Sequence, residues 1–193
     1  MQLRIAVIYG SVRPQRVGIR MARYVSRAFR ERGHESTLID PLEHRVPLLQ
    51  QRYRDYGDGE APEVLHFLHR VFEHADAFVA VSAEYNGSIP PALVNVLDYF
   101  LPEYARKPSA VCTYSPGPLG GALAAIPLRQ LFTILGAPPI GAPFRVGRVH
   151  ETFDDSGYTD DEDVHRRFSG FADQVEWYAR ALRTAREAEA GAA

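Results

Sequence analysis

The chain has 193 residues, of which 46% are hydrophobic and 24% charged, as in an ordinary globular protein with one substantial core. The formal net charge of −2 gives no reason to expect a nucleic acid or a membrane surface as a partner. The single cysteine, Cys112, excludes an internal disulfide and favours a reducing compartment, so we expect a cytoplasmic protein. We expect no membrane span and no signal peptide.

The N-terminal part of the chain predicts a strand, a helix and a second strand. Residues 3–9 are apolar and rich in β-branched side chains, as in a buried strand. Apolar residues then recur at helical spacing from Ile19, and Gly33 is expected to end that helix. A second strand is expected at residues 35–40. The polar loop that follows, 41–60, is longer than most connections, so we expect it to cover another part of the molecule.

The rest of the chain continues this alternation. Pro62 is expected to begin a helix, and residues 77–81 are apolar without alternation, as in a strand covered on both faces. Two more strands are expected at 109–114 and 139–146. The remaining helices are expected over 93–101, before Gly136, and from Val164 to Tyr178, with residues 184–193 as a frayed helical end.

Alternating strands and helices predict a doubly wound α/β domain that spans residues 1–193. Its five parallel strands would carry helices on both faces, and its ligand would lie at the carboxyl ends of the strands. Three loops that contain glycine or asparagine follow directly on predicted strands, at residues 10–18, 83–88 and 115–121. Parallel strands bring these loops to one edge of the sheet, so we expect them to form one site.

The first of these loops predicts an anion site. It joins a strand to the start of a helix, where backbone amides have no partner inside the helix and the helix dipole is positive. Gly10 and Gly18 allow a tight turn, while Ser11, Arg13 and Arg16 add donors suited to phosphate. The spacing is neither a P-loop nor a dinucleotide fingerprint, which favours a mononucleotide. The alternative is a structural turn with solvated arginines.

Each of the three loops carries a motif: Gly10-Ser11-x-Arg13-x-x-Arg16-x-Gly18, then Glu84-Tyr85-Asn86-Gly87-Ser88-Ile89-Pro90, then Ser115-x-Gly117-x-x-Gly120-Gly121. As an ordered set over residues 3–146, these motifs resemble the NADPH-dependent FMN reductase family of flavodoxin-like proteins, which includes quinone, azo-dye and chromate reductases. The sequence departs from the family pattern at Ala83, where proline is usual, and at Pro91 and Val94, which replace glycine and lysine.

The resemblance implies that the first loop binds the FMN phosphate and that the other two flank the isoalloxazine ring. The implied cofactor-binding residues are Ser11, Arg13, Arg16, Val17, Gly18, Glu84, Tyr85, Asn86, Gly87, Ser115, Gly117, Gly120 and Gly121. No catalytic side chain is expected, because the chemistry belongs to the flavin. No metal site is expected, because the histidines and acidic residues lack ligand spacing.

The implied activity is transfer of a hydride from NADPH or NADH through FMN to a quinone, an azo dye, a free flavin or a similar acceptor. Arg16, Arg20 and Arg52 are all candidates for the 2′-phosphate of NADPH. The alternative is a flavodoxin-like electron carrier that holds FMN but oxidises no nicotinamide. The short basic first loop and the small net charge favour the enzyme, because carriers commonly use a large field of one sign to dock.

The expected partners are a nicotinamide, a small acceptor and a second copy of the chain, as a homodimer or tetramer, without nucleic acid or membrane. The helices expected near 93–101 and before Gly136 are apolar on more than one side, whereas a helix on a sheet needs one apolar stripe. We expect Leu97 to lie at the subunit seam. The alternative is that the 41–60 loop covers the surplus apolar surface.

Overall fold

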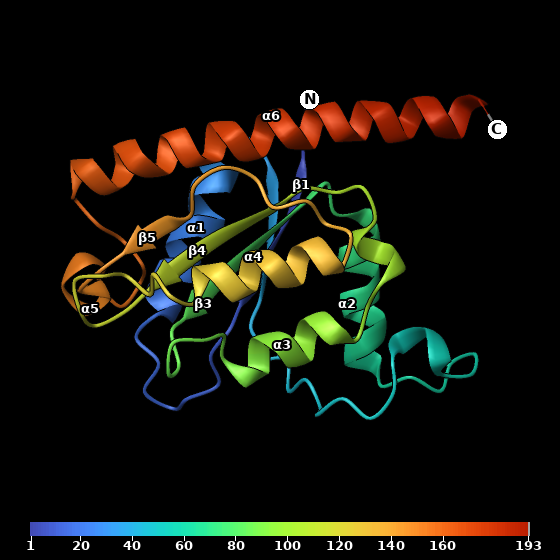
Figure 1. The fold of residues 1–193 in the computed structure, drawn as a ribbon, viewed down its shortest axis with the longest axis horizontal. Coiled ribbons are helices and arrows are strands. Elements are labelled where there is room, and N and C mark those ends of the chain that lie inside the picture. The colour runs from blue at the N-terminus through green and yellow to red at the C-terminus, as the bar shows by residue number, and fades with distance from the viewer. Residues whose placement is uncertain (193) are drawn as a thin grey trace.

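The computed structural model describes residues 1–192 and contains one five-stranded parallel sheet in the order β2-β1-β3-β4-β5 (Figure 1). The strands are β1 (Arg4–Tyr9), β2 (Glu35–Ile39), β3 (Ala77–Ala83), β4 (Ser109–Tyr114) and β5 (Phe144–Val146). The helices are α1 (Ile19–Glu31), α2 (Glu63–His74), α3 (Pro91–Asp98), α4 (Ala125–Ile134), α5 (Val149–Thr152) and α6 (Glu162–Ala192), with 3-10 turns at Tyr53–Asp55 and Pro102–Tyr104. The predicted flavodoxin-like α/β fold is confirmed.

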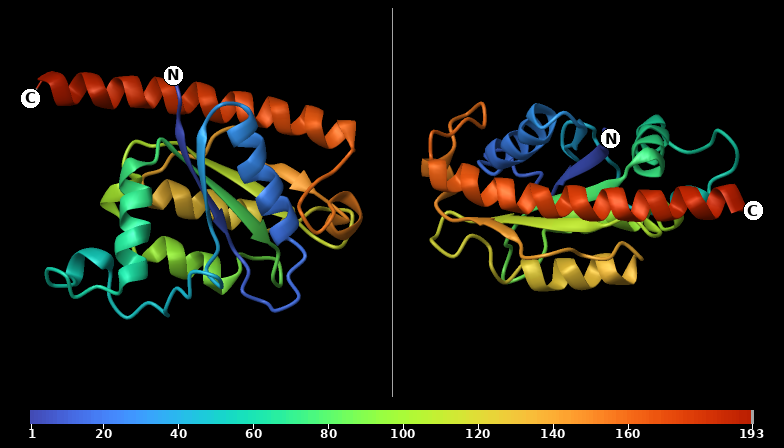
Figure 2. Two further views of the ribbon diagram at one scale, coloured as in Figure 1. Left: turned by 180° about the vertical axis from the view of Figure 1, so that it is seen from behind. Right: turned by 90° about the horizontal axis from the view of Figure 1, so that it is seen from above.

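Helices cover both faces of the sheet because alternate residues of each strand point to opposite sides. On β1, Ile5, Val7 and Tyr9 pack in a core with α1 and α6, whereas Ala6 and Ile8 pack in a second core with α2, α3 and α4. All seven residues of β3 are buried, as expected for a strand covered on both faces. Figure 2 shows α6 running along the length of the molecule.

Several element boundaries differ from those that the sequence predicts. α3 ends at Asp98 because Pro102 disfavours helical backbone at Leu101, and a 3-10 turn follows. β5 spans only residues 144–146, because Pro139 and Pro143 interrupt the predicted strand at 139–146. The one-turn helix α5 was not predicted. α6 is helical through residues 184–192, and residue 193 lies outside the described residues.

The long loop 41–60 packs against the second core. Its side chains Leu49 and Tyr53 are half-buried there, and Asn95 of α3 holds the backbone. The Asn95 amide donates to the Pro47 carbonyl at 2.7 Å and accepts from the Leu49 amide at 2.8 Å. The prediction that this loop covers another part of the molecule is confirmed, and the part it covers is the flank of α3.

The carboxyl ends of the strands gather the three glycine- or asparagine-bearing loops at one edge. Residues 10–18 follow β1, residues 83–88 overlap the end of β3, and residues 115–121 follow β4. In Figure 1 these loops lie together at the left of the molecule, beside α5. The parallel topology therefore brings segments far apart in sequence into one site.

Candidate functional site

A pocket of about 470 Å³ opens at this edge. Its size falls in the range of small-molecule and cofactor sites. The lining residues come from the first loop, the ends of β3 and β4 and the start of α5: Ser11, Arg13, Pro14, Gln15, Arg16, Val17, Gly18, Ala83, Glu84, Tyr85, Tyr114, Ser115, Pro116 and Val149.

Most of the predicted site residues line this pocket. Those that line it are Ser11, Arg13, Arg16, Val17, Gly18, Glu84, Tyr85 and Ser115, whereas Asn86, Gly87, Gly117, Gly120 and Gly121 lie outside its lining. The lining residues that the sequence did not predict are Pro14, Gln15, Ala83, Tyr114, Pro116 and Val149. Tyr114 was recoverable, because it is the last residue of a strand at the edge where ligands bind.

The first loop presents unused backbone donors to the pocket. Among residues 1–192, the amides of Gln15, Val17 and Gly18 make no hydrogen bond. α1 begins at Ile19 without a side-chain cap and without an acidic residue in its first turn. Unpaired amides at the positive end of a helix dipole favour an anion. The predicted phosphate chemistry therefore fits the geometry of the loop.

Ser11 and Arg13 both contact Tyr85, which joins the first loop to the second. The Ser11 and Tyr85 hydroxyl oxygens lie 2.8 Å apart, and the Arg13 guanidinium lies 5.6 Å from the centroid of the Tyr85 ring. Tyr85 thus directs its hydroxyl toward the anion loop and offers its ring face to a cation. Arg13 is exposed and makes no ion pair within residues 1–192, which leaves its charge available.

Arg16 lies at the pocket, but its guanidinium is engaged elsewhere. It donates to both carboxylate oxygens of Asp40, at 2.8 and 2.6 Å, and to the Ser11 carbonyl at 3.2 Å. The side chains of Arg16 and Asp40 are only 9% and 3% exposed. Arg16 therefore meets the pocket mainly through its backbone, and its charge is balanced beneath the loop.

Tyr114 lines the pocket beside Gly18, and Tyr9 lies next to Tyr114. A Cβ atom at residue 18 would lie 1.8 Å from Cζ of Tyr114, so only glycine leaves room for that ring. The Tyr114 and Tyr9 hydroxyls lie 3.0 Å apart. Burial raises the pKa of Tyr9 to about 12 and that of Tyr114 above its ordinary value. Both phenols therefore stay neutral at physiological pH and add no negative charge near an anion.

The second loop is a tight hairpin. Asn86 and Gly87 have φ of 50° and 75°, and the backbones of Tyr85 and Ser88 exchange hydrogen bonds of 2.9 and 3.0 Å. The turn expected at Asn-Gly is thus present, because these residues tolerate left-handed backbone. Glu84 accepts a hydrogen bond of 2.9 Å from the Leu123 amide, which ties the hairpin to the start of α4.

The glycines of the third loop have a packing role. Gly121 has φ of +70°, and a Cβ there would lie 2.8 Å from the Tyr114 carbonyl oxygen. Gly120 has φ of +63°, and a Cβ there would lie 3.1 Å from backbone atoms of Val146 and Gly147. The Thr113 hydroxyl donates to the Gly120 carbonyl at 2.7 Å. These contacts fold the loop back over β4 and β5, and contact with a flavin ring stays a prediction.

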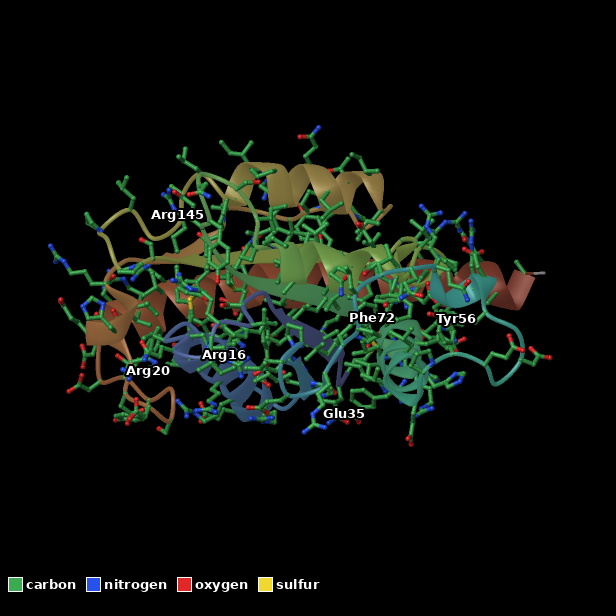
Figure 3. The ribbon with its side chains drawn as sticks, turned by 90° about the horizontal axis from the view of Figure 1, so that it is seen from below. Arg16, Arg20, Glu35, Tyr56, Phe72 and Arg145 are labelled. Carbon is green, nitrogen blue, oxygen red and sulfur yellow. The ribbon has the colours of Figure 1, made fainter. Side chains whose placement is uncertain are left out.

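The three arginines considered for a nicotinamide phosphate occupy different surroundings. Arg20 donates to the Phe153 carbonyl at 3.0 Å and pairs with Asp155, so it anchors the segment after α5. Figure 3 places Arg16 and Arg20 at one end of the molecule and Tyr56 at the other. Arg52 belongs to the same 3-10 region as Tyr56 and does not line the pocket.

Residues 3–151 match the model of the NADPH-dependent FMN reductase family. The chain belongs to this family. A quinone reductase from Pseudomonas putida is 31% identical over 166 residues, which are 82% of this chain and 85% of the relative. A 2-hydroxy-1,4-benzoquinone reductase from Burkholderia sp is 28% identical over 187 residues, which are 93% of this chain and 98% of the relative.

Solved structures agree with this assignment. FerB, a flavoenzyme NAD(P)H:(acceptor) oxidoreductase from Paracoccus denitrificans, superimposes with a TM-score of 0.72 at 27% identity, covering 93% of this chain and 97% of FerB. A flavodoxin from Pseudomonas aeruginosa gives a TM-score of 0.53 at 18% identity, covering 93% and 98% of the two chains, and shows the fold alone. The FMN reductase is thus an NAD(P)H-dependent oxidoreductase with FMN as its flavin.

The residues of the pocket fit FMN, because free amides, Ser11 and Arg13 provide the donors that a phosphate monoester requires. Within residues 1–192, no group of three histidine, cysteine or acidic side chains could hold a metal ion. No helix in that part of the chain is long and apolar enough to cross a membrane.

Proposed function

We propose that this FMN reductase is a quinone reductase that works as a homodimer in the cytoplasm. The observation that carries the proposal is the open pocket that the three motif loops form around Tyr85. With FMN bound in this pocket, the open face of the flavin would receive a flat acceptor such as a quinone. The names of the Pseudomonas putida and Burkholderia relatives support the same class of acceptor. The buried, isolated Cys112 supports a reducing compartment.

In this proposal the first loop holds the phosphate of FMN. The amides of Gln15, Val17 and Gly18, the Ser11 hydroxyl and the Arg13 guanidinium would surround the phosphate oxygens. Each group is a donor, and the positive end of α1 adds to their field. Because the phenols of Tyr9 and Tyr114 are neutral, they add no negative charge that would repel the phosphate.

The second and third loops hold the flavin ring in the same proposal. Tyr85 and Ser115 both line the pocket, and the hairpin at Asn86 and Gly87 is rigid because its ends are hydrogen-bonded. Gly117, Gly120 and Gly121 shape the opposite loop. Hydride uptake from a nicotinamide and electron transfer to an acceptor belong to the bound cofactor. The protein's part is to orient it and to leave one face open.

The homodimer would form through the exposed face of α4. Ile126 and Ile134 of α4 are 68% and 73% exposed, and Leu123, just before the helix, is 56% exposed, an apolar surface that is unusual on a monomer. The prediction that Leu97 lies at the seam is wrong, because Leu97 is fully buried with Leu93 and Val96 against the sheet. Two-fold pairing is the commonest closed assembly, and it would bring Glu84 and its hairpin near the partner subunit.

The activity is tested by mixing the purified protein with FMN and NADPH and following the nicotinamide absorbance with and without benzoquinone. We expect oxidation that depends on the quinone, and NADH in place of NADPH defines the donor preference. A protein that binds FMN but leaves the nicotinamide unoxidised would be an electron carrier instead.

If the nicotinamide and the quinone share one pocket, the first must leave before the second enters. Steady-state kinetics with both substrates varied should therefore give the parallel lines of a ping-pong reaction. Intersecting lines would show that both substrates bind at once and would contradict a shared pocket.

The dimer is tested with Ile126→Asp, which places a charge on the exposed face of α4. We expect sedimentation to show monomers for this variant and dimers for the wild type. Tyr158→Asp is the matched control, because Tyr158 is 58% exposed and lies between α5 and α6. A monomeric wild type at micromolar concentration would refute the homodimer.

A further inference from the structure

The Asp40–Arg16 pair lies directly beneath the anion loop and is not explained by the reaction. Arg16 belongs to the loop, whereas Asp40 is the residue that follows β2. The pair is bidentate, at 2.8 and 2.6 Å, and both side chains are almost completely shielded from solvent. Arg–carboxylate pairs of this geometry fix the orientation of both partners as well as adding energy.

Asp40 is itself held in place by its own turn. One of its carboxylate oxygens accepts from the Leu42 amide at 3.0 Å, and its carbonyl accepts from the His44 amide at 2.9 Å. The His44 Nδ1 atom lies 2.8 Å from the same carbonyl and 3.2 Å from the Asp40 amide. The carboxylate therefore has a position set by the end of β2 and by residues 40–44. Through Arg16, this fixed carboxylate anchors the anion loop to the end of β2.

Arg16 transmits that position to the loop at three points. Its guanidinium donates to the Ser11 carbonyl at 3.2 Å, which orients the peptide between Ser11 and Val12. It lies 5.6 Å from the centroid of the Tyr9 ring, at the end of β1. Its backbone lies between Gln15 and Val17, whose amides are free to bind an anion. One buried side chain thus links both ends of the loop to the sheet.

We infer that Asp40 is a positioning residue for the FMN phosphate, acting through Arg16 to hold the loop amides in their binding geometry. Asp40 does not touch the phosphate in this scheme. Its negative charge keeps the Arg16 guanidinium buried. Without it, the exposed Glu43 carboxylate, 3.6 Å from the guanidinium, would be the remaining charge partner, so Arg16 would move toward water and take the loop backbone with it. The charge that reaches the phosphate then comes from Arg13 and from the aligned amides.

The inference rests on the FMN site proposed above, and comparison of two flavins tests it separately. Asp40→Asn removes the charge and keeps the shape. We expect the FMN dissociation constant, measured by quenching of flavin fluorescence, to rise at least about tenfold, the loss of roughly one charge-assisted hydrogen bond. Riboflavin, which lacks the phosphate, should bind the variant and the wild type within about twofold, because a ligand without phosphate gains nothing from the aligned amides.

Asp76→Asn is the matched control, since Asp76 is also a buried aspartate that pairs with arginine but lies at the other edge of the sheet. It should lower the melting temperature and leave both flavin affinities unchanged. If Asp40→Asn does not fold, Asp40→Glu is used in its place. Glutamate keeps the negative charge, but its extra methylene displaces the Arg16 guanidinium. We expect the same selective loss of FMN affinity.

Two results would overturn the inference. Unchanged or tighter FMN binding by the variant would mean that Arg16, once freed, reaches the phosphate itself. An equal loss for FMN and riboflavin would mean that Asp40 supports the domain as a whole. A wild type that binds neither flavin would contradict the proposed site instead, so the two failures are distinguishable.

Discussion

Polar groups at the amino ends of the parallel strands, here called the amino edge, differ in their pairing from those at the carboxyl ends, the carboxyl edge. At the amino edge, polar groups are paired with each other: Asp76 accepts from the Arg4 amide at 2.9 Å and pairs with Arg183 and Arg186 of α6. Lys107 donates to the carbonyls of residues 72 and 73 at the end of α2. At the carboxyl edge, within residues 1–192, the amides of Gln15, Val17 and Gly18 make no hydrogen bond and Arg13 makes no ion pair.

This difference teaches which groups serve stability and which serve binding. A buried charge without a partner destabilises a fold. At the amino edge Asp76 is paired with Arg183 and Arg186, and these ion pairs hold α6 against the strands. The free donors at the carboxyl edge belong to residues that line the pocket, so they remain available to water or to a ligand. We therefore expect changes at the amino edge to alter stability and changes at the carboxyl edge to alter affinity.

The largest effect is expected for Asp76→Ala. Removing one partner of a buried network should cost about 3–5 kcal/mol of unfolding free energy, because Arg183 and Arg186 lose their shared carboxylate. Chemical denaturation measures this loss. The FMN dissociation constant of the folded variant should stay at the wild-type value, and a large change in it would mean that the two edges are coupled.

Arg13→Ala, at the carboxyl edge, should weaken FMN binding and leave the stability of the fold unchanged. A charge-assisted hydrogen bond is worth about 1.5–3 kcal/mol, so FMN should bind roughly tenfold to a hundredfold more weakly. The melting temperature without FMN should not change, because Arg13 is exposed. Isothermal titration gives the affinity, with Arg45→Ala as an exposed loop control. An unaffected dissociation constant would place the phosphate elsewhere.

Gly18→Ala should lower both stability and FMN affinity, because Gly18 makes room for the Tyr114 ring and also lines the pocket. The new methyl group would overlap the Tyr114 ring, and overpacking of this kind costs about 1–3 kcal/mol. We expect both a lower melting temperature and weaker FMN binding. Gly170→Ala is the control, since nothing lies within 4 Å of a Cβ at that position in α6. A stable Gly18→Ala protein with normal affinity would contradict the packing of Tyr114.

The smallest effect is expected from titration of Lys107 at the amino edge. Burial lowers the pKa of Lys107 to about 8, below its ordinary value. Between pH 8 and its unfolded pKa of about 10.4, the unfolded chain binds more protons, so this group makes stability rise with pH.

Lys107→Met removes this contribution, so the stability difference between wild type and variant should shift in favour of the wild type by on the order of 1 kcal/mol from pH 8 to 10. Urea denaturation at several pH values measures the difference, which cancels the titration of the tyrosines. A difference that is independent of pH would mean that the pKa of Lys107 is not lowered.

Much of the architecture follows from local sequence patterns. The uninterrupted apolar runs of β1 and β3 can be buried only inside a sheet covered on both faces, and Asn86-Gly87 specifies a tight turn through its backbone preference. The boundaries of α3 and β5 were predicted less well. There, prolines compete with apolar patterns, and their effect depends on which amides the fold requires.

The sequence by itself determined the order of strands and helices, the edge at which the loops meet, and the basic and glycine-rich character of the first loop. Only the tertiary structure decided which of the two loop arginines has no ion-pair partner and which of the two apolar helices stays exposed. Arg13 and Arg16 look alike in sequence, yet Asp40, brought close by the pairing of β1 with β2, engages only Arg16. Likewise the loop 41–60 covers α3 and leaves α4 exposed. Such differences depend on contacts between distant segments, which local periodicity does not encode.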